Sequence, residues 1–265
     1  MIIKKQNYLK HAIVLFLLLL LMQPERAWAA YENVEFSSLT NHDGLTNSQV
    51  GAILKDTRGY IWFGTQSGLC RFDGFRMKTF YYINTDDKSL PNNSVDELQQ
   101  DYGGNIWVHT SVGYCIYKYD EEQFERKPEE WLKNIHVQGP PYKLLIDKDK
   151  NMWIAVYGQG LYYHNAKTKN TYLFKFTKKA QPGCLKEGNI SKITEVDGDA
   201  LITYGDGTIC RVNGQKQKVL WYNSFLANHK AAGDNGAYTF YDGIGGFWVS
   251  VSNANYVYQS KTGKW

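Results

Sequence analysis

The sequence has little excess charge of either sign and almost no long hydrophobic stretches. Its 265 residues include 30 basic and 26 acidic side chains, and four of the basic and one of the acidic ones lie in the first 29 residues. The remainder carries 26 against 25, which excludes the strongly basic balance of a nucleic-acid-binding domain. The longest apolar run, Ala12–Met22, has 11 residues, whereas a membrane-spanning helix needs about 20. No later stretch approaches that length, so residues 30–265 predict no transmembrane helix.

The first 29 residues carry the marks of a secretory signal peptide. Three lysines accompany the start of the chain, the apolar run follows them, and Ala27–Ala29 reads A-W-A, an A-x-A cleavage site. The pattern predicts a signal peptide over residues 1–29, export of the chain, and a mature protein of residues 30–265. An uncleaved membrane anchor is the alternative interpretation.

Motifs of metal and redox sites are also lacking. The four cysteines form no C-x-x-C pair, and the histidines show no H-E-x-x-H spacing. Asp147–Asn151 resembles the start of an EF-hand loop, but Met152 stands where that loop requires glycine and Gly158 where it requires glutamate. We therefore expect a structural turn at this segment, no metal site and no cofactor.

A unit of about 46 residues repeats along the mature chain. Its recurring positions are Trp62, Trp107, Trp153, Leu201 and Trp248. The spacings are 45, 46, 48 and 47 residues, and each position lies in a short apolar run between two turns, with further strand-like segments on either side. Four short strands repeated every 40 to 50 residues are typical of β-propeller blades. We predict an all-β fold, a β-propeller of about five four-stranded blades over residues 30–265. One helical turn is expected in Asp120–Ile135, where Pro128 limits it.

The recurring tryptophan predicts a core position rather than a ligand platform. Middle strands of stacked blades are buried on both faces and read as continuous apolar runs, as IWFGT at 61–65 does. Trp62 is expected to fill the space between neighbouring blades, where burial of such a ring contributes about 3 kcal/mol. Cys70, Cys115 and Cys210 take equivalent places in different repeats, too far apart for a disulfide, and are expected to be small buried hydrophobic residues.

The acidic residues argue against catalysis. A glycosidase needs two carboxylates that face each other across a pocket. Four acids instead recur at the equivalent turn of successive units, where aspartate is a turn former. They are Asp56, Asp101, Asp147 and Glu195. Asp96 and Asp206 occur in one unit each, and nothing in the sequence pairs them, so we assign no catalytic residue.

Two segments carry a resemblance to a known family. Asp43–Val50 reads DGLTNSQV and precedes D-x-x-G-x-I-W-F-G-T-x-x-G-L-x-R-F-D-G, and LPNNSV at 90–95 precedes DYGGNIWVHT. This pattern resembles the repeat of the two-component regulator propellers, the extracytoplasmic sensor regions of hybrid two-component systems typical of gut Bacteroidetes. The resemblance is strong in the first two units and weaker in the last two. Leu201 replaces the tryptophan of the fourth unit, and His109 stands where Gly64 stands in the first.

The resemblance implies a periplasmic propeller that senses a carbohydrate or a glycan-derived ligand. In such proteins the propellers precede a membrane helix, a histidine kinase, a receiver and a DNA-binding module, none of which this sequence contains. Membrane attachment beyond the signal peptide, a homodimer and kinase activity are therefore expected only of a full-length protein. Family rings usually have seven blades, which predicts that the five units are an incomplete N-terminal part; a complete five-bladed ring is the alternative. The alternative function is a stand-alone exported propeller that binds protein or glycan as a scaffold.

A ligand is expected on the face formed by two sets of loops. These loops join each outer strand to the next inner strand, and the second strand to the third. Tyr157, Gln159, Tyr204 and Asp206 lie in or beside them and combine aromatic faces with hydrogen-bonding groups, which suits a small-molecule or oligosaccharide ligand. The alternative is that they are ordinary turn residues. His109, on a middle strand, is either a hydrogen-bonded core histidine or a further ligand contact.

Overall fold

The computed structural model describes residues 38–178, 184–224, 238–251, 254–259 and 264. The chain divides into two compact units, Met1–Ser38 and Leu39–Trp265, and every described strand belongs to the second. The predicted signal peptide at residues 1–29 lies outside the described residues.

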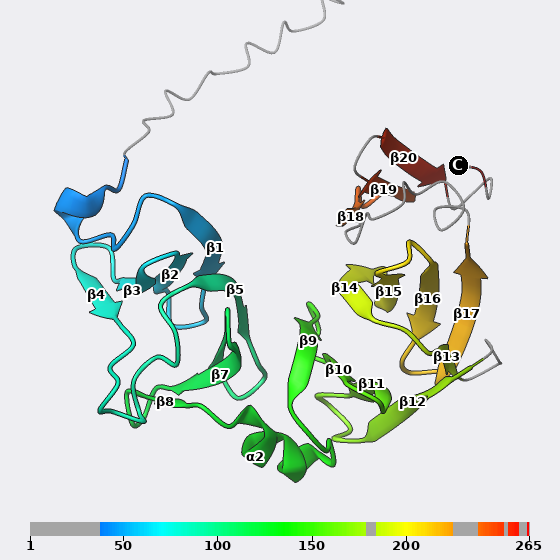
Figure 1. The fold of residues 1–265 in the computed structure, drawn as a ribbon, viewed down its shortest axis with the longest axis horizontal. Helices are drawn as coiled ribbons and strands as arrows, with labels where there is room; N and C mark the ends of the chain where they lie inside the picture. The colour runs from blue at the N-terminus through cyan, green and yellow to red at the C-terminus, as the bar shows by residue number, and fades with distance from the viewer. Residues whose placement is uncertain (1–37, 179–183, 225–237, 252–253, 260–263, 265) are drawn as a thin grey trace, which may run out of the picture. The chain divides into compact units, whose positions relative to one another are not determined.

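The described residues of the second unit form five sheets that follow one another along the chain (Figure 1). Blade 1 contains β1 (Val50–Lys55), β2 (Ile61–Thr65), β3 (Gly68–Phe72) and β4 (Met77–Phe80). Blade 2 contains β5 (Val95–Gln100), β6 (Ile106–Thr110), β7 (Gly113–Lys118) and β8 (Gln123–Glu125). Blade 3 contains β9 (Pro141–Ile146), β10 (Met152–Val156), β11 (Gly160–His164), β12 (Thr171–Thr177) and the short β13 (Leu185–Lys186). Blade 4 contains β14 (Ile190–Val196), β15 (Asp199–Tyr204), β16 (Ile209–Asn213) and β17 (Lys218–Asn223). Blade 5 contains β18 (Tyr238–Tyr241), β19 (Gly246–Val251) and β20 (Ala254–Gln259).

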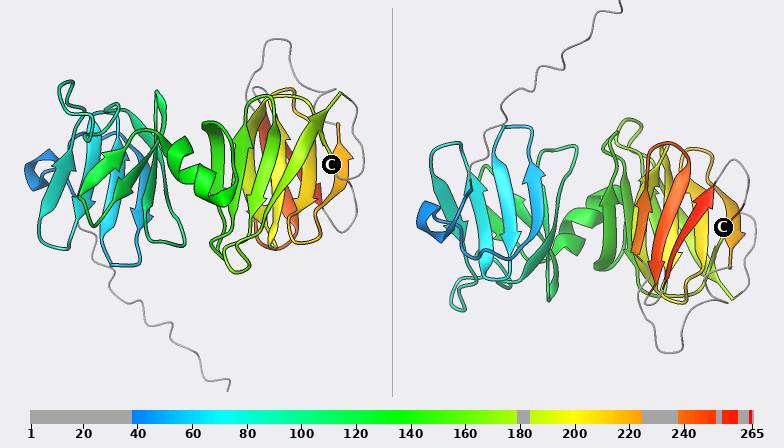
Figure 2. Two further views of the ribbon diagram at one scale, coloured as in Figure 1. Left: turned by 90° about the horizontal axis from the view of Figure 1, so that it is seen from below. Right: turned by 90° about the horizontal axis from the view of Figure 1, so that it is seen from above.

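The strands of each blade lie side by side in chain order and form an antiparallel meander, to which blade 3 adds the short parallel strand β13 (Figure 2). The first strand of every blade contacts the first strand of the next one, from β1 through β5, β9 and β14 to β18. This neighbour relation is that of propeller blades, and it confirms the predicted all-β fold. Blade 5 shows three strands among the described residues rather than the predicted four.

A repeated aspartate ties the turn between the first two strands to the tryptophan of the second strand. In blade 1, Asp56 Oδ1 accepts hydrogen bonds from the backbone N–H groups of Arg58 and Tyr60, and Oδ2 accepts one from Trp62 Nε1 at 2.7 Å. The indole N–H groups of the next two blades donate to the matching aspartates, at 3.0 Å in blade 2 and 3.4 Å in blade 3. The aspartates are therefore turn formers, as expected, and the EF-hand-like segment at 147–151 is one of these turns.

Blade 4 departs from this pattern in a way that the sequence alignment misses. Its first two strands are joined by a two-residue turn at Asp197 and Gly198, both with positive φ, as a type I′ hairpin requires. The buried acid of this blade is consequently Asp199, whose carboxylate accepts from Arg211 Nε at 2.6 Å. Glu195 was expected at the equivalent turn, but it lies within β14 and instead accepts from the backbone N–H of Lys148 in blade 3.

The recurring apolar residue fills the space between consecutive blades. Trp62 packs with Val95 and Leu98 of blade 2, and Trp153 packs with Ile193 and Ile202 of blade 4. Trp62, Trp107, Trp153 and Leu201 are at most 1% exposed. The predicted core role is confirmed for these four positions. Trp248 in blade 5 is 48% exposed, so the fifth member of the series is not enclosed by the described residues.

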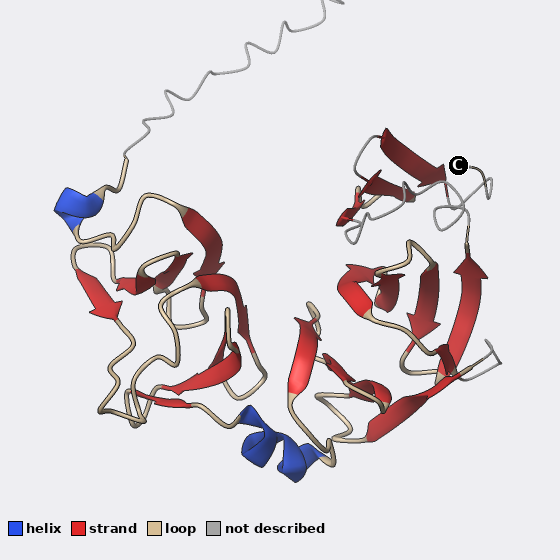
Figure 3. Cartoon of the chain, in the orientation of Figure 1, coloured by secondary structure: helices blue, strands red, loops and turns tan. Residues whose placement is uncertain are grey.

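Helical structure is confined, in the described segments, to η1 (Asn41–Asp43) and to α2 (Pro128–Leu132) with η2 (Lys133–Ile135), which connect β8 to β9 (Figure 3). Pro128 was expected to limit the helical turn, but it occupies the first turn of α2, where a missing N–H costs nothing. No helix in the described part of the chain is long and apolar enough to cross a membrane.

All four cysteines are free, and Cys70, Cys115 and Cys210 are buried, as predicted.

Candidate functional site

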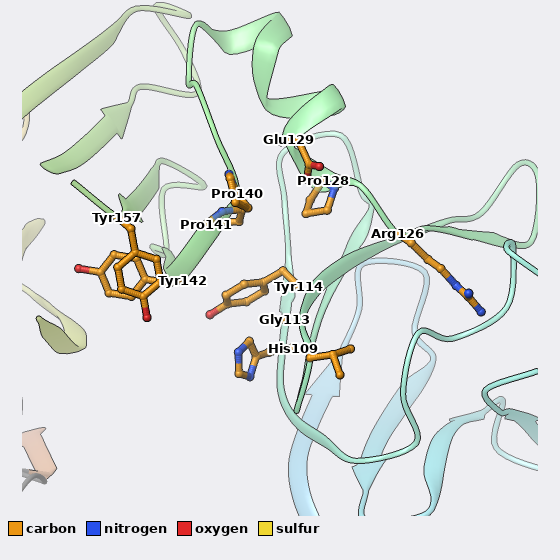
Figure 4. Close-up of a pocket in the computed structure, with 11 residues that line it drawn as sticks. His109, Gly113, Tyr114, Arg126, Pro128, Glu129, Pro140, Pro141, Tyr142 and Tyr157 are labelled. Atoms are coloured by element: carbon orange, nitrogen blue, oxygen red, sulfur yellow. The ribbon is translucent and has the colours of Figure 1, made fainter. Parts of the chain in front are cut away.

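A pocket of about 470 Å³ is lined by residues of blades 2 and 3 and of α2, which lies between them in the chain (Figure 4). Its border includes the β6–β7 turn at Val112 and Gly113, the connection into β9 at Pro140, and the β10–β11 turn at Tyr157. These are the two sets of loops on which a ligand was expected. The pocket contains two of the five residues proposed from the sequence, His109 and Tyr157.

The pocket exists because blades 2 and 3 lack a contact that blades 1 and 2 make. A Cβ placed on Gly64 in β2 would lie 2.6 Å from Cγ1 of Val95 in β5, so these two residues leave no space between them. The strand registers place His109 where Gly64 stands and Pro141 where Val95 stands. Both replacements line the pocket instead of closing it.

Two stacked tyrosines form one wall. The rings of Tyr142 and Tyr157 lie 3.9 Å apart between centroids and 17° from parallel, one above the other in Figure 4. Tyr142 is anchored to blade 4, because its hydroxyl oxygen accepts a hydrogen bond from the backbone N–H of Ile190 at 3.3 Å. Tyr157 is 69% exposed, on the outer side of the stack. Burial raises the pKa of Tyr142, so its hydroxyl stays protonated at neutral pH.

His109 and Tyr114 form the opposite wall. Nδ1 of His109 lies 2.6 Å from Oδ1 of Asp96, and the imidazole packs on the Tyr114 ring with centroids 4.5 Å apart. The Tyr114 hydroxyl donates to Glu97 Oε2 at 2.8 Å and accepts the N–H of Leu144 in β9 at 3.2 Å. Burial and the Glu97 charge raise the pKa of Tyr114 well above its usual value. This wall is therefore fixed by bonds to β5 and β9.

Arg126 borders the pocket, but its charge is directed elsewhere. Its guanidinium extends away from the tyrosine pair in Figure 4. The guanidinium donates to the carbonyl oxygens of Asp86, Ser89 and Leu90 at 2.8–3.2 Å and to the Ser89 hydroxyl at 2.7 Å. Its Nε and Nη2 groups thus hold the connection between β4 and β5. Among the described residues, no group of three or more histidine, cysteine, aspartate or glutamate side chains could hold a metal ion.

The other three proposed residues lie outside this pocket. Gln159 is engaged at both ends of its amide, because Nε2 donates to the Gln138 carbonyl at 2.8 Å and Oε1 accepts from the Tyr162 hydroxyl. Tyr204 is 1% exposed in the core shared by blades 3 and 4, and burial raises the pKa of its hydroxyl.

Asp206 forms an ion pair with Lys186 at 2.6 Å in the β15–β16 turn. Partial burial alone would raise the pKa of Asp206, but hydrogen bonds from Lys186 and Thr208 outweigh it and lower the pKa. The structure thus brings His109 and Tyr157 together and leaves Gln159, Tyr204 and Asp206 apart from them. Binding by these three stays a prediction.

Sequence reasoning missed Tyr114 and Tyr142. Neither residue was in the loops on which a ligand was expected. Tyr114 belongs to an apolar strand run, and Tyr142 directly follows Pro140 and Pro141. A signal was nevertheless present: Pro140 and Pro141 stand at the start of β9, whereas β1, β5 and β14 begin with valine or isoleucine.

Comparisons with known proteins agree with this fold. The model of the two component regulator propeller family matches residues 44–67, the segment that runs from the entry into blade 1 through β2. The match and the fold together confirm the resemblance to this family. No curated protein matches the sequence.

Among solved structures, the chain is similar to the extracellular domain of a Bacteroides thetaiotaomicron protein described as the hybrid two component system BT3049. The identity is 21%, the match covers 86% of this chain and 31% of that one, and the TM-score is 0.57. It is also similar to PorZ, a surface component of the type-IX secretion system of Porphyromonas gingivalis, at 12% identity, 83% and 27% coverage and a TM-score of 0.50. The chain spans less than a third of either protein.

Proposed function

We propose that this chain, a β-propeller with a two-component regulator propeller repeat, is an extracytoplasmic ligand-sensing segment of a signal-transduction regulator. The ligand is a carbohydrate or a glycan-derived molecule, and the pocket between blades 2 and 3 receives it. The chain itself senses and does not catalyse. Its place in the cell is the periplasm, to which the signal-peptide pattern and the extracellular relative both point.

The observation that carries this proposal is the pairing of an aromatic stack with a hydrogen-bonded histidine across one pocket. Sugar rings present a flat apolar face and a rim of hydroxyl groups, and the stacked Tyr142 and Tyr157 match the first while His109 and Asp96 match the second. The stack and the histidine come from adjacent blades, so a bound ligand would contact both.

A second candidate is a stand-alone exported propeller that serves as a protein- or glycan-binding scaffold. The similarity to PorZ favours it, because that protein is a surface component of a secretion system. The reading frame downstream of Trp265 separates the two candidates. A membrane helix and a histidine kinase in that frame would support the sensor, whereas a stop codon without a kinase gene nearby would support the scaffold.

Glycan binding by the full chain tests the site directly. We expect an immobilised glycan panel to show binding, and Tyr157→Ala to weaken the best signal by about tenfold or more, equivalent to about 1.4 kcal/mol, because half of the stack is removed. Phe75→Ala is the matched control, since Phe75 is an aromatic side chain that is 95% exposed and does not line the pocket. Equal binding by all three proteins would reject this pocket as the site.

A further inference from the structure

Carboxylates lie in and beside the pocket. The carboxylate of Asp96, next to the lining residue His109, accepts from His109 Nδ1 at 2.6 Å. Glu129 supplies a carboxylate in the lining itself. The hydroxyl proton of Tyr114 is already donated to Glu97. A ligand that supplied the donors would complement this arrangement.

The cationic groups near the pocket are already paired. Arg126 directs its guanidinium to three backbone carbonyls and to Ser89, away from the tyrosines. Lys143, in β9, pairs with Glu97 at 3.7 Å. Among the residues that line the pocket, Arg126 is the cationic side chain, and its guanidinium extends away from the tyrosine pair.

The acidic groups are accessible by contrast. The Asp96 side chain is 54% exposed beside His109, and Glu129 lies in the lining, whereas the charge of Glu97 is offset by its pair with Lys143. Like charges brought together in a partly dry site repel, so a carboxylate or sulfate on the ligand would be penalised here. The face of a tyrosine ring, the negative side of its quadrupole, attracts a cation.

We propose that this pocket selects donor-rich, uncharged or amine-bearing sugars and rejects sugars that carry a carboxylate or a sulfate. His109 and Asp96 are the specificity-determining pair, Glu129 reinforces them, and the Tyr142–Tyr157 stack supplies the ring contact. This inference rests on the proposed function, because it names the class of glycan that the same pocket binds.

A glycan panel sorted by charge tests the selection with the full chain. Four classes are compared on matched backbones: unmodified, amine-bearing, carboxylate-bearing and sulfated oligosaccharides. We expect the carboxylate and sulfate classes to bind about tenfold more weakly than the unmodified class, equivalent to about 1.4 kcal/mol. Amine-bearing sugars should bind at least as well as unmodified ones, and this arm separates attraction of cations from simple hydroxyl recognition.

Charge variants show whether the pocket is responsible. Glu129→Lys should reduce the ratio of affinities for unmodified over carboxylate-bearing sugars by about tenfold, and Asp96→Asn should reduce it less. Both proteins should keep the thermal transition of the parent chain. Glu121→Gln is the matched control, because its carboxylate is 54% exposed and lies outside the pocket. Preferential binding of carboxylate- or sulfate-bearing sugars would overturn the selection and leave the sensing proposal intact. Binding of no glycan in any class would overturn the proposed function, and the selection with it.

Discussion

The junction between blades 1 and 2 and the junction between blades 2 and 3 use the same strands in different ways. At the first, Gly64 makes room for Val95, Trp62 is fully buried, and the space is filled. At the second, Trp107 is buried equally well at 1% exposed, but His109 and Pro141 replace the glycine and the valine and line a pocket. The tryptophan therefore secures the fold at both junctions, while a position two residues further along the same strand decides whether the mouth of the junction is closed.

This difference separates stability from function along a single strand. A residue that packs against the next blade contributes by burial, whereas a residue at the open mouth contributes polar groups. Predictions that disturb one position at a time can break or sharpen that separation.

Removal of Trp62 should have the largest effect. Trp62→Ala would leave a cavity between blades 1 and 2 and remove the indole N–H from Asp56, at a cost of about 3–5 kcal/mol in the free energy of unfolding. The measurement is urea-induced unfolding followed by circular dichroism. Trp248→Ala is the control: it removes the same side chain at a 48% exposed position and should cost less than about 1 kcal/mol. Equal losses would mean that burial between blades is not what the tryptophan provides.

The next prediction concerns the contact between Gly64 and Val95, which closes the junction between blades 1 and 2. Gly64→Ala should destabilise the chain by about 1–3 kcal/mol, because the added Cβ would lie 2.6 Å from Val95 Cγ1 and one of the two blades must shift. His109→Ala, at the equivalent position in blade 2, should cost less than Gly64→Ala, since it removes a partly exposed side chain at the pocket and forces no blade to shift. The same unfolding experiment compares both. A Gly64→Ala protein as stable as the parent would contradict the account of the closed junction.

The smallest expected effect is a pH dependence of the free energy of unfolding, which we expect to arise at the junction between blades 2 and 3. His164 of blade 3 is 1% exposed and stacks on Tyr102 in the β5–β6 turn. Its Nε2 has no hydrogen-bond partner, and the ammonium group of Lys169 lies over the Tyr102 ring, 3.6 Å from its centroid. Burial first, and then the charges of Lys169 and His136, lower the pKa of His164 below its usual value. The unfolded chain therefore binds the proton more readily, and stability should fall as pH decreases below about 6.5.

The test is the melting temperature measured between pH 8 and pH 5. His164→Asn can still donate to Thr171 Oγ1, as Nδ1 does at 2.9 Å, but does not titrate. Its melting temperature should decline less over the same range than that of the parent chain. Parallel curves for the two proteins would assign the acid sensitivity to other groups.

The fold was predictable because its signal is repeated. A tryptophan at a period of about 46 residues, with an aspartate six positions before it in four units, states the same local structure several times, so errors in one unit are corrected by the others. Even there, the fourth unit shows the limit. Glu195 and Asp199 are both acids near a turn, and only the two-residue hairpin at Asp197 and Gly198 decides which of them is buried.

The candidate site was predictable only in part, because it depends on single positions rather than on the repeat. Tyr204 was placed among loop residues, yet it ends β15 and alternation turns it into the core. Tyr142 was missed because its partner, Tyr157, lies 15 residues away, and only the pairing of β9 with β10 brings the two rings together. Contacts of this kind are set by register between strands, which no local pattern in the sequence states.

The two-residue strand β13 has a consequence for how the molecule behaves in a crowded compartment. It pairs in parallel with the end of β12, which at seven residues is the longest outer strand that the structure describes and carries Tyr172, Leu173, Phe174 and Phe176. A long aromatic outer strand with open hydrogen-bonding groups is a template for pairing with another chain. Leu185 and Lys186 occupy part of that edge and so shorten the template. Blade 3, which also carries the exposed Tyr157, is thereby protected against edge-to-edge pairing with other chains.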